Sequence, residues 1–338
     1  MIEPAEAAEP TDVAAAASAG ESGGKRPARS ARSGKTLVRE VFGLTDVGLV
    51  REGNEDALLM LGEQGLFVVA DGMGGHACGE VASAFTIEAI RAFYHSAEIT
   101  QRVRAAHRRT RGGKGNANQD TSFHALRLRK AVESANISVY RLAQQHEQLR
   151  DMGTTVVATA FCGGRVYVAN VGDSRVYRMR RGELLQLTDD HSLLNEYLRM
   201  NLLRPEDAES FPYKNVIVRA LGLQEAVTVD ITMSTVLVGD QILLCTDGLT
   251  DLVRDHEICD ILAKAPTAEA ACHRLTDMAK SRGGHDNITT LIIRIHESEA
   301  QLPKKLAPLH IPPPPRSAPG SGAAPSIPPP PAAPAPQG

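Results

Sequence analysis

The sequence lacks several features that would indicate a particular partner or environment. It has no Cys-x-x-Cys pair, no apolar run of about 18 residues and no excess of one charge, since 40 acidic residues face 37 basic ones. A formal net charge of −3 gives no reason to expect nucleic acid or an anionic membrane as a partner. The first residues, MIEPAEAAEP, are acidic and have no apolar core. We therefore expect neither a membrane span nor a secretory leader.

The cysteines are few and odd in number. Two of the five, Cys162 and Cys245, lie in apolar strand-like runs, where a free thiol behaves as a small hydrophobic group. This usage favours a reducing compartment, and we expect the protein to be cytoplasmic.

Composition divides the chain into three parts. Residues 1–35 are rich in Ala, Gly and Ser, and residues 298–338 hold 14 of the 20 prolines. Neither segment can bury enough apolar surface to fold, so both are predicted to be disordered, the second with polyproline II character. The proline-rich tail is either a docking segment for a partner or a plain flexible tail. Residues 36–297 are the predicted folded domain.

Hydrophobic periodicity within 36–297 predicts many short strands and paired helices. The linkers 162–165 and 181–182 are typical of hairpin turns, so the strands on either side of each should be antiparallel neighbours. Asp255 and Thr267 suit helix N-caps. The pattern predicts an α+β fold, a β-sandwich of two antiparallel sheets flanked by pairs of helices. Strands are expected at 37–48, 57–62, 66–70, 154–161, 165–171, 175–180, 183–188, 215–220, 227–233, 241–246 and 288–295, and helices at 80–95, 121–149, 191–200, 205–209, 256–264 and 267–281.

Four aspartates stand at the ends of strand-like runs. Asp71, Asp173 and Asp247 each end such a run, and Asp286 comes just before one. Converging carboxylates repel one another unless they share cations. Ligation by oxygen atoms suits Mg²⁺ or Mn²⁺ rather than zinc, and Gly72 would let its backbone carbonyl approach an ion without a Cβ in the way. A single Asp-Gly is usually a turn, but four such positions favour a two-metal site.

The stretch TDVGLVREGNED, residues 45–56, contains an arginine that could bind a phosphate, followed by acidic residues. Arg51 could hold a phosphate through two parallel hydrogen bonds, and it stays charged at any relevant pH. The adjacent Glu55 and Asp56 could belong to the surroundings of the same metal ions.

These motifs together resemble the bacterial metal-dependent protein phosphatases of type 2C, the PPM family. The resemblance is carried, in family order and across about 40–295, by DVGLVREGNED at 46–56, ADGMGGHACGE at 70–80, MGTT at 152–155, GDSRVY at 172–177, TDDHS at 188–192, TDGL at 246–249 and HDNIT at 285–289. It implies the same sandwich fold with helix pairs outside.

The resemblance also implies roles for individual residues. Asp71 would bridge two Mn²⁺ or Mg²⁺ ions, the Gly72 carbonyl would bind one of them, and Asp247 and Asp286 would complete the pair. Asp173 would join Asp247 at a third, weaker metal site. The implied roles of the remaining residues are substrate-phosphate binding for Arg51 and, for Glu55 and Asp56, contacts with metal-coordinated waters. The implied reaction is attack of a metal-bridging water on phosphoserine or phosphothreonine in proteins, in opposition to a bacterial Hanks-type kinase.

Some positions depart from the animal members of the family or carry no clear role. Met73 stands where those members have a histidine proposed as general acid. His76 and His191 are candidate donors, although a structural role is expected for both, and the general acid stays unassigned. Residues 102–120 look like an enlarged basic loop. The stretch 195–220 matches the family's flap, which borders the active site.

Two other functions remain open on the sequence alone. A catalytically silent phosphoprotein-binding module would not need all of Arg51, Asp71, Asp173, Asp247 and Asp286. Another two-metal phosphohydrolase, such as a nuclease, usually brings histidine ligands, and two of the three Asp-Gly or Asp-Ser corners have none.

Overall fold

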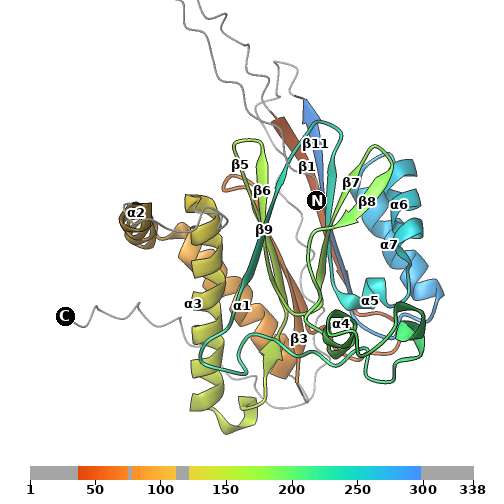
Figure 1. The fold of residues 1–338 in the computed structure, drawn as a ribbon, viewed down its shortest axis with the longest axis horizontal. Helices are drawn as coiled ribbons and strands as arrows, with labels where there is room; N and C mark the ends of the chain where they lie inside the picture. Colours follow the sequence, from red (N-terminus) through yellow and green to blue (C-terminus); the bar gives the residue numbers. More distant parts are fainter. Residues whose placement is uncertain (1–36, 75–77, 112–121, 298–338) are drawn as a thin grey trace, which may run out of the picture. The chain divides into compact units, whose positions relative to one another are not determined.

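The computed structural model describes residues 37–74, 78–111 and 122–297, which contain two antiparallel sheets (Figure 1). Sheet A has the strand order β1 (Leu37–Asp46), β11 (Ile288–Glu297), β10 (Gln241–Cys245), β7 (Arg175–Arg180) and β8 (Glu183–Gln186). Sheet B has the order β2 (Asp56–Leu61), β3 (Leu66–Met73), β5 (Val156–Cys162), β6 (Arg165–Val171) and β9 (Asp230–Thr235), with β4 (Gly153–Thr154) beside β3.

Helices cover the outer face of each sheet. Figure 1 shows α1 (Cys78–His95) and α3 (Phe123–Gln145) against sheet B, and α6 (Asp255–Lys264) and α7 (Ala268–Ser281) against sheet A. The remaining helical elements are α2 (Ala97–Arg111), η1 (Glu147–Leu149), α4 (Leu193–Arg199), η2 (Pro205–Ser210) and α5 (Asp247–Thr250). The expected α+β sandwich with flanking helix pairs is therefore confirmed.

Strand periodicity explains why the sandwich has three apolar layers. In β3, Leu66 and Val68 pack in the cluster that contains α1 and α3, whereas Phe67 and Val69 face sheet A. Successive side chains of a strand point to opposite faces, so a central strand covered on both faces is apolar throughout. The layer between the sheets also contains Val157, Val166, Val168, Val176, Ile242, Leu244, Leu291, Ile293 and Ile295.

Both hairpins that the sequence predicts are present. Strands β5 and β6 pair antiparallel, and Gly163 and Gly164 in their turn have φ of 56° and 75°. Strands β7 and β8 pair in the same way through Arg181 and Gly182, with φ of 52° and 83°. Positive φ at both central residues matches the twist of the flanking strands, which is why two-residue turns of this kind close hairpins.

The prediction of a loop over 102–120 was wrong for its first half. Residues up to Arg111 belong to α2, and residues 112–121 lie outside the described residues. Ile99 and Val103, four residues apart, pack against the core on the outer face of sheet B. One narrow apolar stripe is enough to dock a helix whose other faces are basic, so the arginine-rich composition was misleading.

The predicted strand at 215–220 does not form. Its backbone makes only isolated bridges, Ile217 with Ser192 and the adjoining Leu221 with Thr154. Val216 and Val218 are largely exposed, because this alternating stretch has no neighbouring strand along its length. The strand expected at 227–233 begins later, at Asp230, where pairing with β6 starts.

Helix boundaries follow hydrogen bonds that the sequence shows only in part. Thr267 caps α7, since its side chain accepts a hydrogen bond from the Ala270 amide. Asp255 does not cap α6. It is the first residue of that helix, and its carboxylate accepts a hydrogen bond from the Tyr177 hydroxyl at 3.0 Å. The expected helix at 121–149 is also shorter, because α3 stops at Gln145 and a separate 3₁₀ turn follows.

Three expectations lie outside the described residues. They concern the tails 1–35 and 298–338 and the histidine at position 76. Within the described residues, no helix is both long enough and apolar enough to cross a membrane.

The layer between the sheets should dominate stability. Phe67 is fully buried there and meets Phe161 edge to face at 5.8 Å between ring centroids. Replacing Phe67 with alanine should lower the free energy of unfolding by about 3–5 kcal/mol, because it removes apolar burial and leaves a cavity. Denaturant unfolding measures this change. The control Leu237→Ala, at an exposed position, should change it by less than about 0.5 kcal/mol, and an equally small effect of Phe67→Ala would contradict the prediction.

Candidate active site

The layer between the sheets changes from apolar to acidic at one end. Alternation along β3 places Asp71 on the same face as Phe67 and Val69, which point at sheet A. Asp56 lies directly opposite Asp71 in the β2–β3 register. The sequence indicated that Asp71 ends its strand. In the structure, β3 continues to Met73 because it pairs with β4. The two carboxylates therefore project from within sheet B toward sheet A.

Asp56 connects the two sheets. Its Oδ2 accepts hydrogen bonds from the Thr246 hydroxyl at 3.0 Å and the Thr289 hydroxyl at 2.7 Å, and both threonines belong to the sheet A side. The other oxygen of Asp56 is buried without a hydrogen-bond partner. These threonines were not singled out in the sequence, where Thr-Asp and Asn-Ile-Thr look like ordinary strand ends.

The backbone around Asp71 is held by Thr154 and Thr155. The Thr155 hydroxyl accepts a hydrogen bond from the Asp71 amide at 3.2 Å, and the Thr154 hydroxyl donates one to the Asp71 carbonyl at 2.8 Å. Gly72 is required here for space, because a Cβ at this position would lie 2.0 Å from the Gly79 carbonyl oxygen. Any side chain at Gly72 would push the start of α1 away from this strand.

Asp173 is placed by a loop that His191 holds. The Gly172 amide donates a hydrogen bond to His191 Nδ1 at 3.0 Å, and the His191 amide donates one to the Gly172 carbonyl at 2.9 Å. Because Nδ1 accepts a hydrogen bond, the neutral ring carries its proton on Nε2, which lies 3.2 Å from Asp230 Oδ2 and 3.0 Å from Arg219 Nη1. Burial lowers the pKa of His191. This histidine is thus a structural support for Asp173 rather than a proton donor to substrate.

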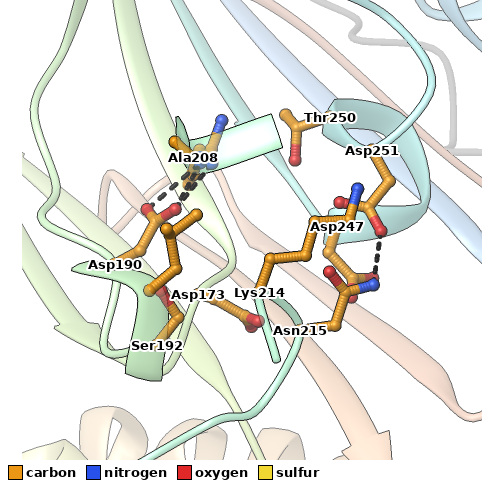
Figure 2. Close-up of a pocket in the computed structure, with 11 residues that line it drawn as sticks. Asp173, Asp190, Ser192, Ala208, Lys214, Asn215, Asp247, Thr250 and Asp251 are labelled. Carbon is orange, nitrogen blue, oxygen red and sulfur yellow. Dashed lines mark hydrogen bonds and ion pairs between the residues drawn. The ribbon is translucent and has the colours of Figure 1, made fainter. Parts of the chain in front are cut away.

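Asp173 and Asp247 line a cavity of about 210 Å³ that the flap borders. Figure 2 shows the side chains of Asp173 and Asp247 at this cavity, with Lys214 and Asn215 of the flap beside them. The flap is attached to the segment after α5 by the side-chain amide of Asn215, whose Nδ2 donates a hydrogen bond to Asp251 Oδ2 at 2.9 Å. The flap predicted at 195–220 therefore borders the acidic end of the sandwich, although it contains a helix and a 3₁₀ turn rather than a strand.

The loop that carries Arg51 is anchored by Asn287. The Asn287 side chain accepts a hydrogen bond from the Glu55 amide at 2.8 Å and donates to the carbonyls of Val47 at 3.0 Å and Gly53 at 2.9 Å. Asn287 immediately follows Asp286 in the sequence, so the segment that supplies one predicted metal ligand also orders the phosphate loop. In the sequence, only the position of Asn287 within the motif HDNIT pointed to this role.

Arg51 itself points toward the acidic group. Its Nη2 lies 2.7 Å from Asp286 Oδ2, and its Nη1 lies 3.8 Å from Glu55 Oε2. The Arg51 side chain is 46% exposed and borders a second cavity, of about 440 Å³, together with Glu55 and Glu80. An ion pair this exposed contributes little to stability, so the guanidinium is free to exchange its partner for a phosphate.

Burial raises the pKa of the clustered carboxyl groups. It raises the pKa of Asp56 and of Asp173 to about 7 and that of Asp247 to about 6, and it also raises the pKa of Asp71. Repulsion from neighbouring aspartates adds to this effect, with Asp56, Asp247 and Asp173 all acting on Asp71. Burial likewise raises the pKa of Glu55, against the lowering effect of Arg51. The charged forms are therefore costly unless a cation accompanies them.

The donor set fits a hard divalent cation. One oxygen each of Asp56, Asp173 and Asp247 is buried without a hydrogen-bond partner. Buried, unpaired carboxylate oxygens are the ligands that Mg²⁺ and Mn²⁺ take. Within the described part of the chain, no three acidic, His or Cys side chains are already gathered closely enough to hold one ion. The fit thus depends on donor chemistry and burial, not on a closed ligand shell.

The structure places each predicted site residue at this end of the sandwich. The predicted residues that contact one another or interact electrostatically are Arg51, Glu55, Asp56, Asp71, Asp173, Asp247 and Asp286. Gly72 follows Asp71 in β3. The sequence reasoning missed the supporting groups, namely Thr154, Thr155, Thr246, Thr289, Asn287 and Asp251. All of them act through contacts between residues distant in the chain.

Comparison with known proteins gives a consistent result. Residues 51–288 match the family described as "Protein phosphatase 2C". The serine/threonine phosphatase Stp of Listeria welshimeri is 36% identical over 252 residues, which are 74% of this chain and 93% of that protein. The serine/threonine protein phosphatase PstP of Mycobacterium tuberculosis is 36% identical over 257 residues, 76% of this chain and 45% of that longer protein.

Solved structures agree in fold. The crystal structure of the Mycobacterium tuberculosis phosphatase PstP/Ppp superposes with a TM-score of 0.65 at 33% identity, covering 77% of this chain and 99% of that one. A PstP catalytic domain in complex with two manganese ions has a TM-score of 0.62 at 34% identity, covering 78% of this chain and all of that one. The latter protein binds two metal ions of the kind that the carboxylates here would fit.

The raised carboxyl pKa values predict that the metal-free protein loses stability as the pH rises. Between the ordinary carboxyl pKa of 3.8 and about 7, the folded state binds more protons than the unfolded state. The stabilisation is therefore complete below the lower value and lost as the pH passes through about 6 to 7. In EDTA the melting temperature should fall by roughly 5 °C from about pH 5.5 to about pH 7.5.

Differential scanning calorimetry of the full chain measures this dependence. Mn²⁺ should restore the melting temperature at the higher pH, because it binds the deprotonated carboxylates of the folded state. Asp173→Asn should weaken the fall, whereas Asp260→Asn, at an exposed position on α6, should leave it unchanged. A melting temperature in EDTA that rises over this range would contradict the prediction.

Proposed function

This chain belongs to the protein phosphatase 2C family, and we propose that it hydrolyses phosphoserine and phosphothreonine in proteins with the help of Mn²⁺ or Mg²⁺. One observation carries the proposal: buried carboxylates with unpaired oxygens lie beside an exposed arginine at one end of the sandwich. The family's metal dependence and the two-manganese PstP structure support the choice of cofactor. The catalytic domain in this proposal comprises residues 36–297.

We assign the proposed roles by position. The metal-binding residues would be Asp71, the carbonyl of Gly72, Asp173, Asp247 and Asp286, with Glu55 and Asp56 acting through water. When bound, such ions lower the pKa of a water molecule so that it can act as nucleophile, and they offset the charge of the phosphoryl group. Asp71, whose backbone amide is held by Thr155, would be the central ligand because the four other aspartates of the cluster all act electrostatically on its carboxyl group.

Arg51 orients the phosphate in this proposal. Its guanidinium is exposed, lies beside Asp286, and can make two parallel hydrogen bonds to phosphoryl oxygens. Asn287 fixes the backbone on both sides of Arg51, so the guanidinium is held near the acidic group before substrate arrives. Preorganised charge of this kind stabilises a transition state without reorganisation during the reaction.

We propose that no side chain of the described residues acts as the general acid. Met73 cannot donate a proton, and His191 is buried with both ring nitrogens in contact with protein groups. Because the described site offers no better donor, we propose that the leaving alkoxide takes its proton from water.

The proposal is tested by phosphate release from a phosphothreonine peptide by the full chain. Turnover should require Mn²⁺ or Mg²⁺, stop in EDTA, and fall by at least about 10³-fold in Asp71→Asn, because the central carboxylate charge is lost. Asp260→Asn should retain full activity. Absence of turnover in folded protein with Mn²⁺ would favour the silent binding module, and faster turnover of a nucleotide phosphodiester would favour a nuclease.

Partners and location follow as further proposals. We propose that substrates include a bacterial Ser/Thr kinase and its targets, because the relatives are named serine/threonine phosphatases. We also propose a cytoplasmic location, which the five unpaired cysteines support. Nucleic acid is not expected as a partner.

Docking through the proline-rich tail is the most testable of these proposals. Removing residues 298–338 should leave hydrolysis of p-nitrophenyl phosphate unchanged and reduce capture of the phosphorylated kinase at least about fivefold, because a tether raises the effective concentration of its partner. Pull-down with the full chain and the truncated chain measures the difference. Equal capture by both forms would show that the tail is only a flexible extension.

A further inference from the structure

Three aliphatic side chains next to Arg51 are exposed to solvent. Leu49 and Val50 are 62% and 61% exposed, and Val47 is 36% exposed. Single exposed aliphatic residues are common on protein surfaces. Three within four positions, immediately before the arginine that faces the acidic group, make this loop an apolar edge beside Arg51.

This edge does not result from a loose loop. The Leu49 amide donates to the Gly284 carbonyl at 2.8 Å, and Asn287 donates to the Val47 carbonyl at 3.0 Å. The Gly48 amide donates to Asp46 Oδ1 at 2.9 Å, and Asp46 in turn pairs with Lys280 at 2.8 Å. These hydrogen bonds hold the backbone of Val47–Leu49, so the exposed apolar side chains belong to an anchored loop.

Leu49 and Val50 lie close to the proposed phosphate site because they directly precede Arg51 in the chain. Consecutive Cα atoms are about 3.8 Å apart, so the Leu49 and Val50 Cα atoms lie within about 8 Å of the Arg51 Cα. The residues that flank a phosphorylated serine or threonine are equally close to it. A substrate whose phosphate reaches Arg51 can therefore place its neighbouring side chains against Leu49 and Val50.

The charges around Arg51 limit which substrate residues can flank the phosphorylated serine or threonine. The cavity that Arg51 borders is also lined by Glu52, Glu55 and Glu80. Acidic residues next to the phosphate would meet these carboxylates, whereas aliphatic residues would bury apolar surface against Leu49 and Val50.

We propose that Leu49 and Val50 select phosphoprotein segments in which large aliphatic residues flank the phosphorylated serine or threonine. The inference rests on the proposed phosphatase function and names its substrate class. Wild-type full-length protein should hydrolyse a phosphothreonine peptide with Leu and Val beside the phosphate about tenfold more efficiently, in kcat/KM, than the same peptide with Ser at those positions. That factor corresponds to burial of roughly one aliphatic side chain.

The chain offers a matched control for the variant. Leu237 and Val238 form another exposed Leu-Val pair, 46% and 53% exposed, in the turn between β9 and β10. The double variant Leu49→Ser with Val50→Ser should reduce the preference to below about twofold, mainly through a higher KM for the aliphatic peptide. The double variant Leu237→Ser with Val238→Ser should keep the tenfold preference.

Each other outcome decides against the proposal. Equal efficiency of wild-type protein toward the two peptides would overturn it without any variant and would leave the phosphatase function standing. An equal loss in the variant toward both peptides and p-nitrophenyl phosphate would mean that Leu49 and Val50 only support Arg51. Loss of a dimer in sedimentation, with unchanged peptide preference, would assign the edge to contact with a second copy. Absence of turnover of every phosphate ester would remove the phosphatase function and this inference with it.

Discussion

Burial of several carboxylates at one end of an otherwise apolar core is the constraint on which the rest of this structure depends. Asp56 and Asp71 project from sheet B into the layer between the sheets, and Asp173 and Asp247 lie at the same end. Desolvation and mutual repulsion both disfavour their charged forms. The arrangement is stable only where hydrogen-bond donors hold the carboxylates and cations can balance them, and this requirement makes it suited to metal-dependent chemistry.

The supporting hydrogen bonds come from both sheets. Thr246 and Thr289 reach Asp56 from sheet A, while Thr154 and Thr155 fix the backbone of Asp71 within sheet B. The two sheets are therefore joined at this end by polar contacts and elsewhere by close apolar packing. Small relative movements of the sheets would change the distances among the carboxylates, so the packed layer between the sheets also sets the geometry of the site.

The groups that we propose to contact the substrate are exposed, in contrast to the buried acids. Arg51, Leu49 and Val50 share one anchored loop, and the flap borders the cavity at Asp173 and Asp247 through Lys214 and Asn215 (Figure 2). In the proposed function, this division would place the chemistry in the buried region and the recognition on exposed loops, which vary more readily than a core.

The sequence by itself determined the fold class, both hairpins, most helices and the identity of the acidic residues, because strand alternation, turn residues and short motifs are properties of neighbouring positions. Only the tertiary structure decided what surrounds those residues. The contacts of Asn287 with the Arg51 loop, of Thr289 with Asp56 and of His191 with Gly172 join segments that the sequence cannot pair. Likewise, residues 215–220 have the pattern of a strand but no neighbour to pair with, and α2 has the composition of a loop but packs through Ile99 and Val103. In each case the deciding interaction is between residues distant in the chain, and local patterns carry no information about such partners.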